Sequence, residues 1–202
     1  VATIERVMAE NSFIDCFGGK ITPLFEDGKT PDWYCKWTMS WVSGLDMGDS
    51  LIPMGKGYPI GANMGFRKEV FRDCGGFNTS LGRTGKNLMG GEEKDMFFRI
   101  RNKGLGIYYI PGIEVSHVIP ASRTTDEFIV RLGQGVGMSE KLRCRNEGGT
   151  SYVKRLFSEL VKWGGTLVLW AGFLLRGHAG RGNKLVLFRW NVSKTLIEND
   201  NN

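Results

Sequence analysis

The sequence has few of the residues that metal sites and covalent catalysis need. Only two histidines and four cysteines occur among 202 residues, and no two cysteines form a C-x-x-C pair. This scattered spacing argues against a zinc site and fits a reducing compartment. No G-x-S-x-G elbow, which would present a nucleophilic serine, is found in the sequence. The sequence therefore gives no support to a zinc enzyme or to a serine hydrolase of the elbow type.

Two glycine-rich segments also fail to match nucleotide-binding motifs. Residues 82–87 have the glycines and the lysine of a phosphate loop, but Ser80 and Asn87 stand where that loop needs Gly and then Ser or Thr. Residues 133–137 (GQGVG) lack the preceding strand and the spacing of a dinucleotide fingerprint. Neither segment predicts a nucleotide site.

Long hydrophobic runs are missing too. The uncharged segment 163–175 has 13 residues, whereas a helix that spans a bilayer needs about 20. No secretory signal peptide is visible, and the sequence begins with Val1 instead of Met, so we expect further residues upstream.

What is present is a globular composition with an uneven charge. Apolar residues make up 41% and charged residues 24%, which argues against wholesale disorder. The net charge is +6, and residues 151–202 carry most of it. A basic tail on a nearly neutral body indicates a local anionic partner, such as a membrane surface, and not a nucleic-acid-binding surface. The basic residues of this tail are Lys154, Arg155, Lys162, Arg176, Arg181, Lys184, Arg189 and Lys194, against the acids Glu159, Glu198 and Asp200.

The hydrophobic spacing predicts an α/β fold followed by helices. Acids in the first turn, a periodic apolar face and basic residues at the end make 92–103 the strongest predicted helix. This order of elements predicts a mixed sheet with flanking helices. The other expected helices are 2–10 and 64–73, and the expected strands lie in 13–25 (interrupted at Gly18-Gly19), 57–63 and 106–118 (interrupted at Pro111-Gly112).

The tail predicts a helical hairpin. Residues 151–175 join a basic amphipathic helix to the uncharged run, and a second helix is expected at 184–197 after a Gly-rich turn. Trp163, Trp170 and Trp190 beside lysines and arginines suit a membrane interface. The alternative, that the hairpin packs on the domain or on a partner, stays open.

The adjacent carboxylates Glu92 and Glu93 are the best candidates for a catalytic centre. They begin the helix directly after Gly90-Gly91, where missing side chains leave room for a substrate. Acids are common at helix starts, because the macrodipole favours them by roughly 0.3–1 kcal/mol. In the functional alternative, one carboxylate points into a cleft as a general base, and the dipole keeps it ionised. Neighbouring helical residues diverge by about 100°, so only one of the two can point there.

Three segments follow one another along the first 145 residues. They are Pro59 through Gly61-Ala62-Asn63 to Gly75-Gly76-Phe77, then Gly91-Glu92-Glu93-Lys94-Asp95-Met96 with Arg99, and then Tyr109-Ile110-Pro111 to His117. Together they resemble the second half of the family 2 glycosyltransferases, which have the GT-A fold. The resemblance implies an inverting transfer of a sugar from a nucleotide-sugar to an acceptor hydroxyl, in cell-surface polysaccharide or glycolipid synthesis.

The resemblance also implies roles for individual residues. In such enzymes an acidic pair at a helix start, usually Glu-Asp, supplies the base. Here Glu93 takes the second position with a side chain one methylene longer, and Glu92 would orient the acceptor or brace the loop. The other implied residues are Gly61, Ala62 and Asn63 in the donor-sugar pocket, Asp95 in substrate binding, His117 near the metal and diphosphate, and Arg123 against the leaving diphosphate.

Two family features are missing from this sequence. The Asp-any-Asp motif of the nucleotide-binding first half is not found, so we expect a divalent cation (Mg²⁺ or Mn²⁺) to be held mainly by residues upstream of Val1. The Gln-x-x-Arg-Trp signature of processive synthases also fails, because Val186 stands three residues before Arg189-Trp190. We therefore expect residues 1–145 to form the acceptor-side half of a GT-A domain, and residues 146–202 to form a basic helical hairpin.

The expected partners are a nucleotide-sugar donor, a glycan or lipid-linked acceptor and an anionic membrane surface, with no nucleic acid. The expected location is the cytoplasm, peripheral to the inner face of the plasma membrane. Two alternatives remain at this point. The chain is either a non-catalytic membrane-associated adaptor that keeps the half-domain as a scaffold, or a truncated product without activity of its own.

Overall fold

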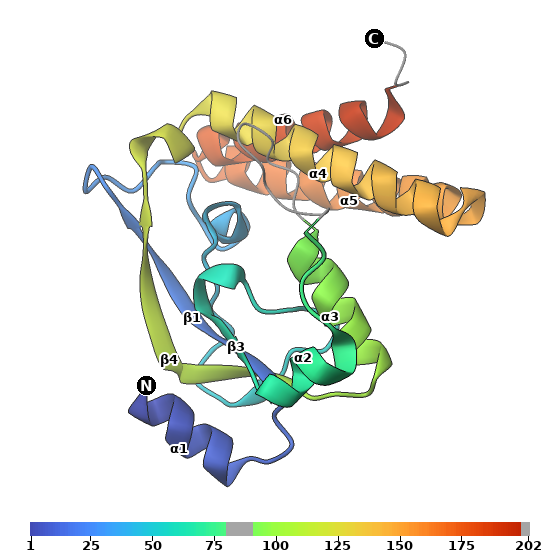
Figure 1. Ribbon diagram of the computed structural model, residues 1–202. Helices are drawn as coiled ribbons and strands as arrows, with labels where there is room; N and C mark the ends of the chain where they lie inside the picture. Colours follow the sequence, from blue (N-terminus) through green and yellow to red (C-terminus); the bar gives the residue numbers. More distant parts are fainter. Residues whose placement is uncertain (80–90, 199–202) are drawn as a thin grey trace. The chain divides into compact units, whose positions relative to one another are not determined.

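The computed structural model describes residues 1–79 and 91–198, apart from the side chains of residues 146 and 147. Residues 82–87, considered above for a phosphate loop, lie outside this description. The described chain forms two compact units, each treated by itself below (Figure 1). The first contains residues 1–24, 42–79 and 91–119, and the second contains residues 25–41 and 120–198. The expected boundary at residue 145 falls inside the second unit, and the assignment of residues 1–145 to a catalytic half stays a prediction.

The first unit is built on a four-stranded sheet in the order β2-β4-β1-β3. The strands are β1 (Cys16–Phe25), β2 (Ile52–Pro53), β3 (Met64–Phe66) and β4 (Ile107–Ile119). Both edge strands pair antiparallel, with Cys16 of β1 opposite Phe66 and Ile52 opposite Tyr109 of β4. The unit is therefore α/β, as the sequence predicts.

The two central strands run in the same direction, which makes the sheet mixed. Gly106, just before β4, accepts backbone hydrogen bonds from the start of β1 through the N–H groups of Asp15 and Cys16. Further along both strands, Gly19 lies against the carbonyl of Ile113. Contacts that advance together along two neighbouring strands define a parallel pair.

Helices cover both faces of this sheet. On one face lie α2 (Lys68–Cys74) and α3 (Glu92–Asn102), and on the other lies α1 (Ala2–Glu10). The helices predicted at 2–10 and 92–103 are thus confirmed. The α3 face buries Met96, Phe97 and Ile100 together with Cys16, Val70 and Tyr109, while Ile4, Val7 and Met8 of α1 pack on Ile14, Phe17, Ile110 and Ile113. Neighbouring strand residues such as Cys16 and Phe17 therefore serve opposite faces, as the period of two requires.

The expected interruptions of two strands do not occur. Both strands continue, because the sheet accommodates the glycine in one and the proline in the other. β1 continues through Gly18-Gly19, and a Cβ at position 19 would lie 2.0 Å from the Ile113 carbonyl oxygen. Glycine therefore permits close contact here instead of breaking the strand. β4 continues through Pro111, which lies beyond the last residue paired with the edge strand β2, Tyr109. The predicted strand 57–63 is instead irregular and ends in the short 3₁₀ helix η2 (Gly61–Asn63).

The second unit is helical. Its long helices are α4 (Asp126–Glu147), α5 (Gly149–Leu175) and α6 (Ala179–Ile197), preceded by the 3₁₀ helices η1 (Met39–Val42) and η3 (Ala121–Arg123). The predicted hairpin is formed by α5 and α6, with a turn shorter than expected, and α4 packs against both (Figure 1). In the part of the chain that the structure describes, no helix has the length and apolar character needed to cross a membrane.

Glycines set the close packing of α4 on α6. A Cβ at Gly133 would lie 2.8 Å from the carbonyl oxygen of Phe188, and one at Gly137 would lie 2.6 Å from that of Val192. These two glycines stand four residues apart, so they share one face of α4. The segment that fails as a dinucleotide motif is therefore a helix-contact surface, where missing side chains let two backbones approach.

Candidate active site

The first turn of α3 carries the acidic pair that the sequence singles out. Glu92, Glu93 and Asp95 all lie in this turn, where the helix dipole favours negative charge. The Glu92 carboxylate turns back toward its own helix start, and its Oε2 accepts a hydrogen bond from the Gly91 N–H at 2.9 Å. The observed contact of Glu92 is thus at the start of its own helix, and both roles expected for it stay predictions.

Glu93 points to a different segment of the first unit. Its Oε1 accepts a hydrogen bond from the Gly61 N–H at 2.8 Å. A Cβ on residue 61 would lie only 2.3 Å from the same oxygen, so glycine is needed for this contact. Gly61 and Ala62 are exposed, and Glu93 is half-buried. The structure therefore places the second carboxylate of the pair against the accessible Gly-Ala-Asn turn.

Asn63 joins this turn to the sheet. Its side chain is only 7% exposed, and Nδ2 donates to the carbonyl oxygens of Lys20 and Ile113, each at 2.9 Å. Lys20 belongs to β1 and Ile113 to β4, so the amide bridges both central strands. The observed contacts of Asn63 are structural, and its place in a donor-sugar pocket stays a prediction.

We expect Asn63→Ala to destabilise the first unit by about 1–3 kcal/mol, because the carbonyls of Lys20 and Ile113 both lose the hydrogen bond from this amide. Amide hydrogen exchange of β1 and β4 measures this change. Asn102→Ala, at the exposed end of α3, is the matched control and should change stability by less than about 0.5 kcal/mol. Equal protection in both variants would contradict the bridging role.

Asp95 is engaged by a neighbour on its own helix. Its Oδ2 lies 2.7 Å from Nη2 and 3.0 Å from Nε of Arg99, one turn later. Arg99 in turn donates to the carbonyl oxygens of Cys74 and Gly76, which follow α2. The pair therefore fastens α3 to the end of α2, and a role for Asp95 in substrate binding stays a prediction.

His117 and Arg123 lie on different units. His117 is half-buried near the end of β4, in the first unit with Glu93 and Asn63. Arg123 belongs to η3 of the second unit, where its guanidinium lies 5.8 Å from the centre of the Phe128 ring. The structure thus brings Gly61, Asn63 and Glu93 together in the first unit, whereas Arg123 belongs to the second.

Other chemistry has little support within residues 1–79 and 91–198. No group of three or more His, Cys, Asp or Glu side chains there is arranged to hold a metal ion. Burial and then the nearby negative charge of Asp15 raise the pKa of the Cys16 thiol to about 12. Cys16 therefore stays protonated and is a core residue, not a nucleophile.

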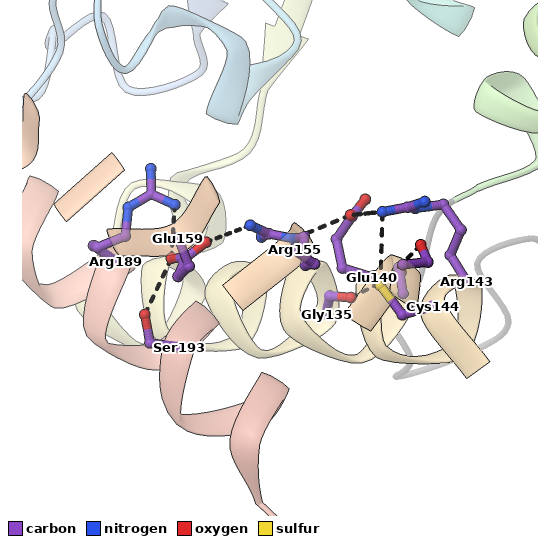
Figure 2. Close-up of polar contacts among 10 residues, drawn as sticks. Gly135, Glu140, Arg143, Cys144, Arg155, Glu159, Arg189 and Ser193 are labelled. Carbon is purple, nitrogen blue, oxygen red and sulfur yellow. Dashed lines mark hydrogen bonds and ion pairs between the residues drawn. The ribbon is translucent and has the colours of Figure 1, made fainter. Parts of the chain in front are cut away.

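The most elaborate polar cluster is one that the sequence reading misses. It joins the three long helices of the second unit (Figure 2). The Glu159 carboxylate accepts from Arg155 Nη1 at 2.6 Å, from Arg189 Nη1 at 3.0 Å and from Ser193 Oγ at 3.0 Å. Arg155 Nε also lies 3.1 Å from Oε2 of Glu140. The side chains of Arg155 and Glu159 are only 4% and 6% exposed.

This cluster lowers the pKa of Glu159. Burial by itself raises the pKa, but hydrogen bonds and charges from Arg189 and Arg155 outweigh it. The signal in the sequence is the spacing of Arg155 and Glu159, four residues apart on one helix. In a segment with a surplus of basic residues, this spacing predicts a solvated ion pair. The sequence of α5 alone does not show that α4 and α6 cover these two side chains.

Comparison of the chain with protein-family models, with curated proteins and with solved structures gives no significant match. The family resemblance therefore rests on the residues and their geometry alone.

Proposed function

We propose that the first unit is the acceptor side of an inverting, nucleotide-sugar-dependent glycosyltransferase of the GT-A type, acting in cell-surface polysaccharide or glycolipid synthesis. In this reaction Glu93 takes the proton from an acceptor hydroxyl. The oxygen forms a bond to the anomeric carbon of the donor sugar while the bond to the nucleoside diphosphate breaks on the opposite side. The products are an inverted glycoside and a nucleoside diphosphate.

The observation that carries this proposal is the hydrogen bond from the Gly61 N–H to Glu93 Oε1. It joins two of the three segments of the resemblance, and Asn63 joins the third through the carbonyl of Ile113. Two segments that are far apart in the sequence thus meet at the Glu93 carboxylate, and the third contacts the same turn through Asn63. A helix-start acid with only a capping role would bond to its own backbone, as Glu92 does. This contrast favours Glu93 as the base.

The second part of the proposal is a divalent cation. The described residues do not gather a metal-binding set around His117. We propose that Mg²⁺ or Mn²⁺ and most of the nucleotide are held by residues that precede Val1 in the parent protein. His117, Arg123 and Asp95 remain proposed contacts of the diphosphate and substrate.

We further propose that the protein works in the cytoplasm at the inner face of the plasma membrane, on a glycan or lipid-linked acceptor. The support is the basic charge of the second unit and its helices, which are not needed for the Glu93 cluster.

A transfer assay tests the proposal. The full-length protein is incubated with radiolabelled uridine- and guanosine-diphosphate sugars and with membranes that supply the acceptor. Label that enters glycolipid or polysaccharide supports the transferase, and no transfer with any donor contradicts it. Titration of uridine diphosphate into residues 1–202 tests the placement of the donor site, because tight binding would show that it is not upstream.

Gly61→Ala is expected to lower kcat about tenfold to a hundredfold, because the new Cβ meets Glu93 Oε1 and shifts the base by about an ångström. Stability should change little, since the atom that must move is the end of a flexible side chain. Gly76→Ala is the matched control, because a Cβ there meets nothing within 4 Å. Equal activity of the two variants, measured as kcat, would argue against a precise position for Glu93.

A further inference from the structure

The second unit has a basic pocket that the proposed reaction does not use. Its volume is about 510 Å³, and it opens between α4 and the first half of α5. Four basic side chains line it, against the single acid Glu140, and three hydroxyl groups lie among them. The basic side chains are Arg143, Lys154, Arg155 and Lys162, and the hydroxyl groups belong to Thr150, Ser151 and Ser158. Positive charge with hydroxyl donors is the environment that a phosphate group prefers.

The positive charge of the pocket exceeds what its acids neutralise. Glu140 lies 2.9 Å from Arg143 and 3.1 Å from Arg155, so this one carboxylate serves two guanidinium groups (Figure 2). Neither Lys154 nor Lys162 forms an ion pair with a described residue. Burial and then the charge of Arg155 lower the pKa of Lys162. A bound anion would relieve this repulsion.

An exposed apolar face runs along α5 beside the pocket. Six of its side chains are at least 63% exposed, namely Val153, Phe157, Leu160, Val161, Val168 and Leu175. Their spacing of four, three, one, seven and seven residues places them on one side of the helix. Lys154 and Lys162 directly follow Val153 and Val161 of this face, so each lies about 100° farther around the helix than its neighbour, and the basic pocket flanks the apolar face on one side. Apolar side chains bordered by lysines are typical of helices that lie in a membrane interface.

We propose that the pocket binds the phosphate group of an anionic phospholipid while the apolar face of α5 enters the boundary between headgroups and acyl chains of the leaflet that it meets. This specifies the membrane partner named under the proposed function, but it does not depend on the sugar transfer. Charge complementarity selects this occupant, because Arg143 and Arg155 already pair with Glu140 and Glu159, and a protein partner on the apolar face would add no anion for Lys154 and Lys162.

Vesicle co-sedimentation of the full chain tests this proposal. We expect binding to phosphatidylcholine vesicles that contain phosphatidylglycerol, and little binding to pure phosphatidylcholine. Lys154→Gln with Lys162→Gln should weaken binding roughly thirtyfold, from about fivefold for each basic side chain near an anionic surface. Lys56→Gln with Lys68→Gln removes the same charge from exposed lysines of the first unit. An equal loss of vesicle affinity in this control would overturn the proposed pocket, because net charge alone would then explain the binding.

The apolar face and the source of the phosphate need their own measurements. Phe157→Ser with Val168→Ser, both well exposed, should keep the fold and weaken vesicle binding at least about tenfold. Unchanged binding would overturn insertion of α5. Calorimetry with pyrophosphate, without vesicles, separates a lipid from a soluble phosphate. Tight binding of pyrophosphate without binding to vesicles would overturn the proposal that a lipid supplies the phosphate group. Glu93→Gln should bind vesicles normally, so failure of the transferase and failure of this inference are distinguishable.

Discussion

Replacement of Glu93 by Gln in the full-length protein is expected to lower kcat at least about a hundredfold, the lower range for loss of a general base. The amide oxygen of Gln can still accept the hydrogen bond from the Gly61 N–H, so the turn should keep its position. What is lost is the ability to take a proton from the acceptor hydroxyl. Transfer of radiolabelled sugar at saturating donor and acceptor measures the change.

Glu92→Gln is the matched control for this prediction. The observed partner of Glu92 is the N–H of Gly91, and an amide oxygen accepts that hydrogen bond as well. We therefore expect less than about a tenfold loss, below the usual effect of removing a catalytic acid or base. Near-normal turnover of Glu93→Gln would contradict the assignment of Glu93 as the base. A greater decrease of kcat in Glu92→Gln than in Glu93→Gln would assign that role to Glu92.

The second large effect concerns the stability of the helical unit. Glu159→Gln should lower the free energy of unfolding by about 3–5 kcal/mol, the range for a buried charge that loses its partner. The change keeps the volume of the side chain, but Arg189 then faces a neutral group and Arg155 must share Glu140 with Arg143. Glu198→Gln, which removes an exposed carboxylate from its pair with Lys194, is the control and should cost less than about 1 kcal/mol.

Tryptophan fluorescence during urea unfolding is well suited to this measurement. The six tryptophans are Trp33, Trp37, Trp41, Trp163, Trp170 and Trp190, and all of them belong to the second unit. The signal therefore reports that unit alone, while exchange in β1 and β4 reports the other. Coincident curves for Glu159→Gln and Glu198→Gln would show that the buried cluster adds nothing to stability.

The same carboxylate gives the unit a defined response to acid. The folded state lowers the pKa of Glu159 below its ordinary value of 4.5. The stabilisation is therefore complete above that value and is lost as the pH falls through the lower folded pKa. In this acidic range, the free energy of unfolding of Glu159→Gln should decrease less steeply with falling pH than that of the native chain.

The sequence predicts elements best where one local pattern determines them. Helix α3 has acids at its start, basic residues at its end and an apolar face between, and the structure confirms it. The strands around Gly18-Gly19 and Pro111-Gly112 are harder, because those residues are explained by neighbours distant in the chain. Residue 19 is a glycine because the Ile113 carbonyl approaches it closely, and no local sequence pattern contains that information.

The candidate site shows the same division. The acidic pair and the Gly-Ala-Asn turn are visible in the sequence, but which of the two carboxylates meets the turn depends on how α3 packs. The polar network around Glu159 cannot be predicted from the sequence for a related reason. Arg155 and Arg189 count as surface charge until α4, α5 and α6 are seen to enclose them.

The position of that network within α5 has a mechanical consequence. Polar groups on one side of the helix bind it to α4 and α6, while its apolar side is exposed. The helix is thus already formed before it meets any surface, and no coil-to-helix ordering opposes adsorption. Circular dichroism should accordingly show no gain of helix when anionic vesicles are added, in contrast to a peptide that folds as it binds. The affinity would then depend on the lipids present and very little on chain entropy.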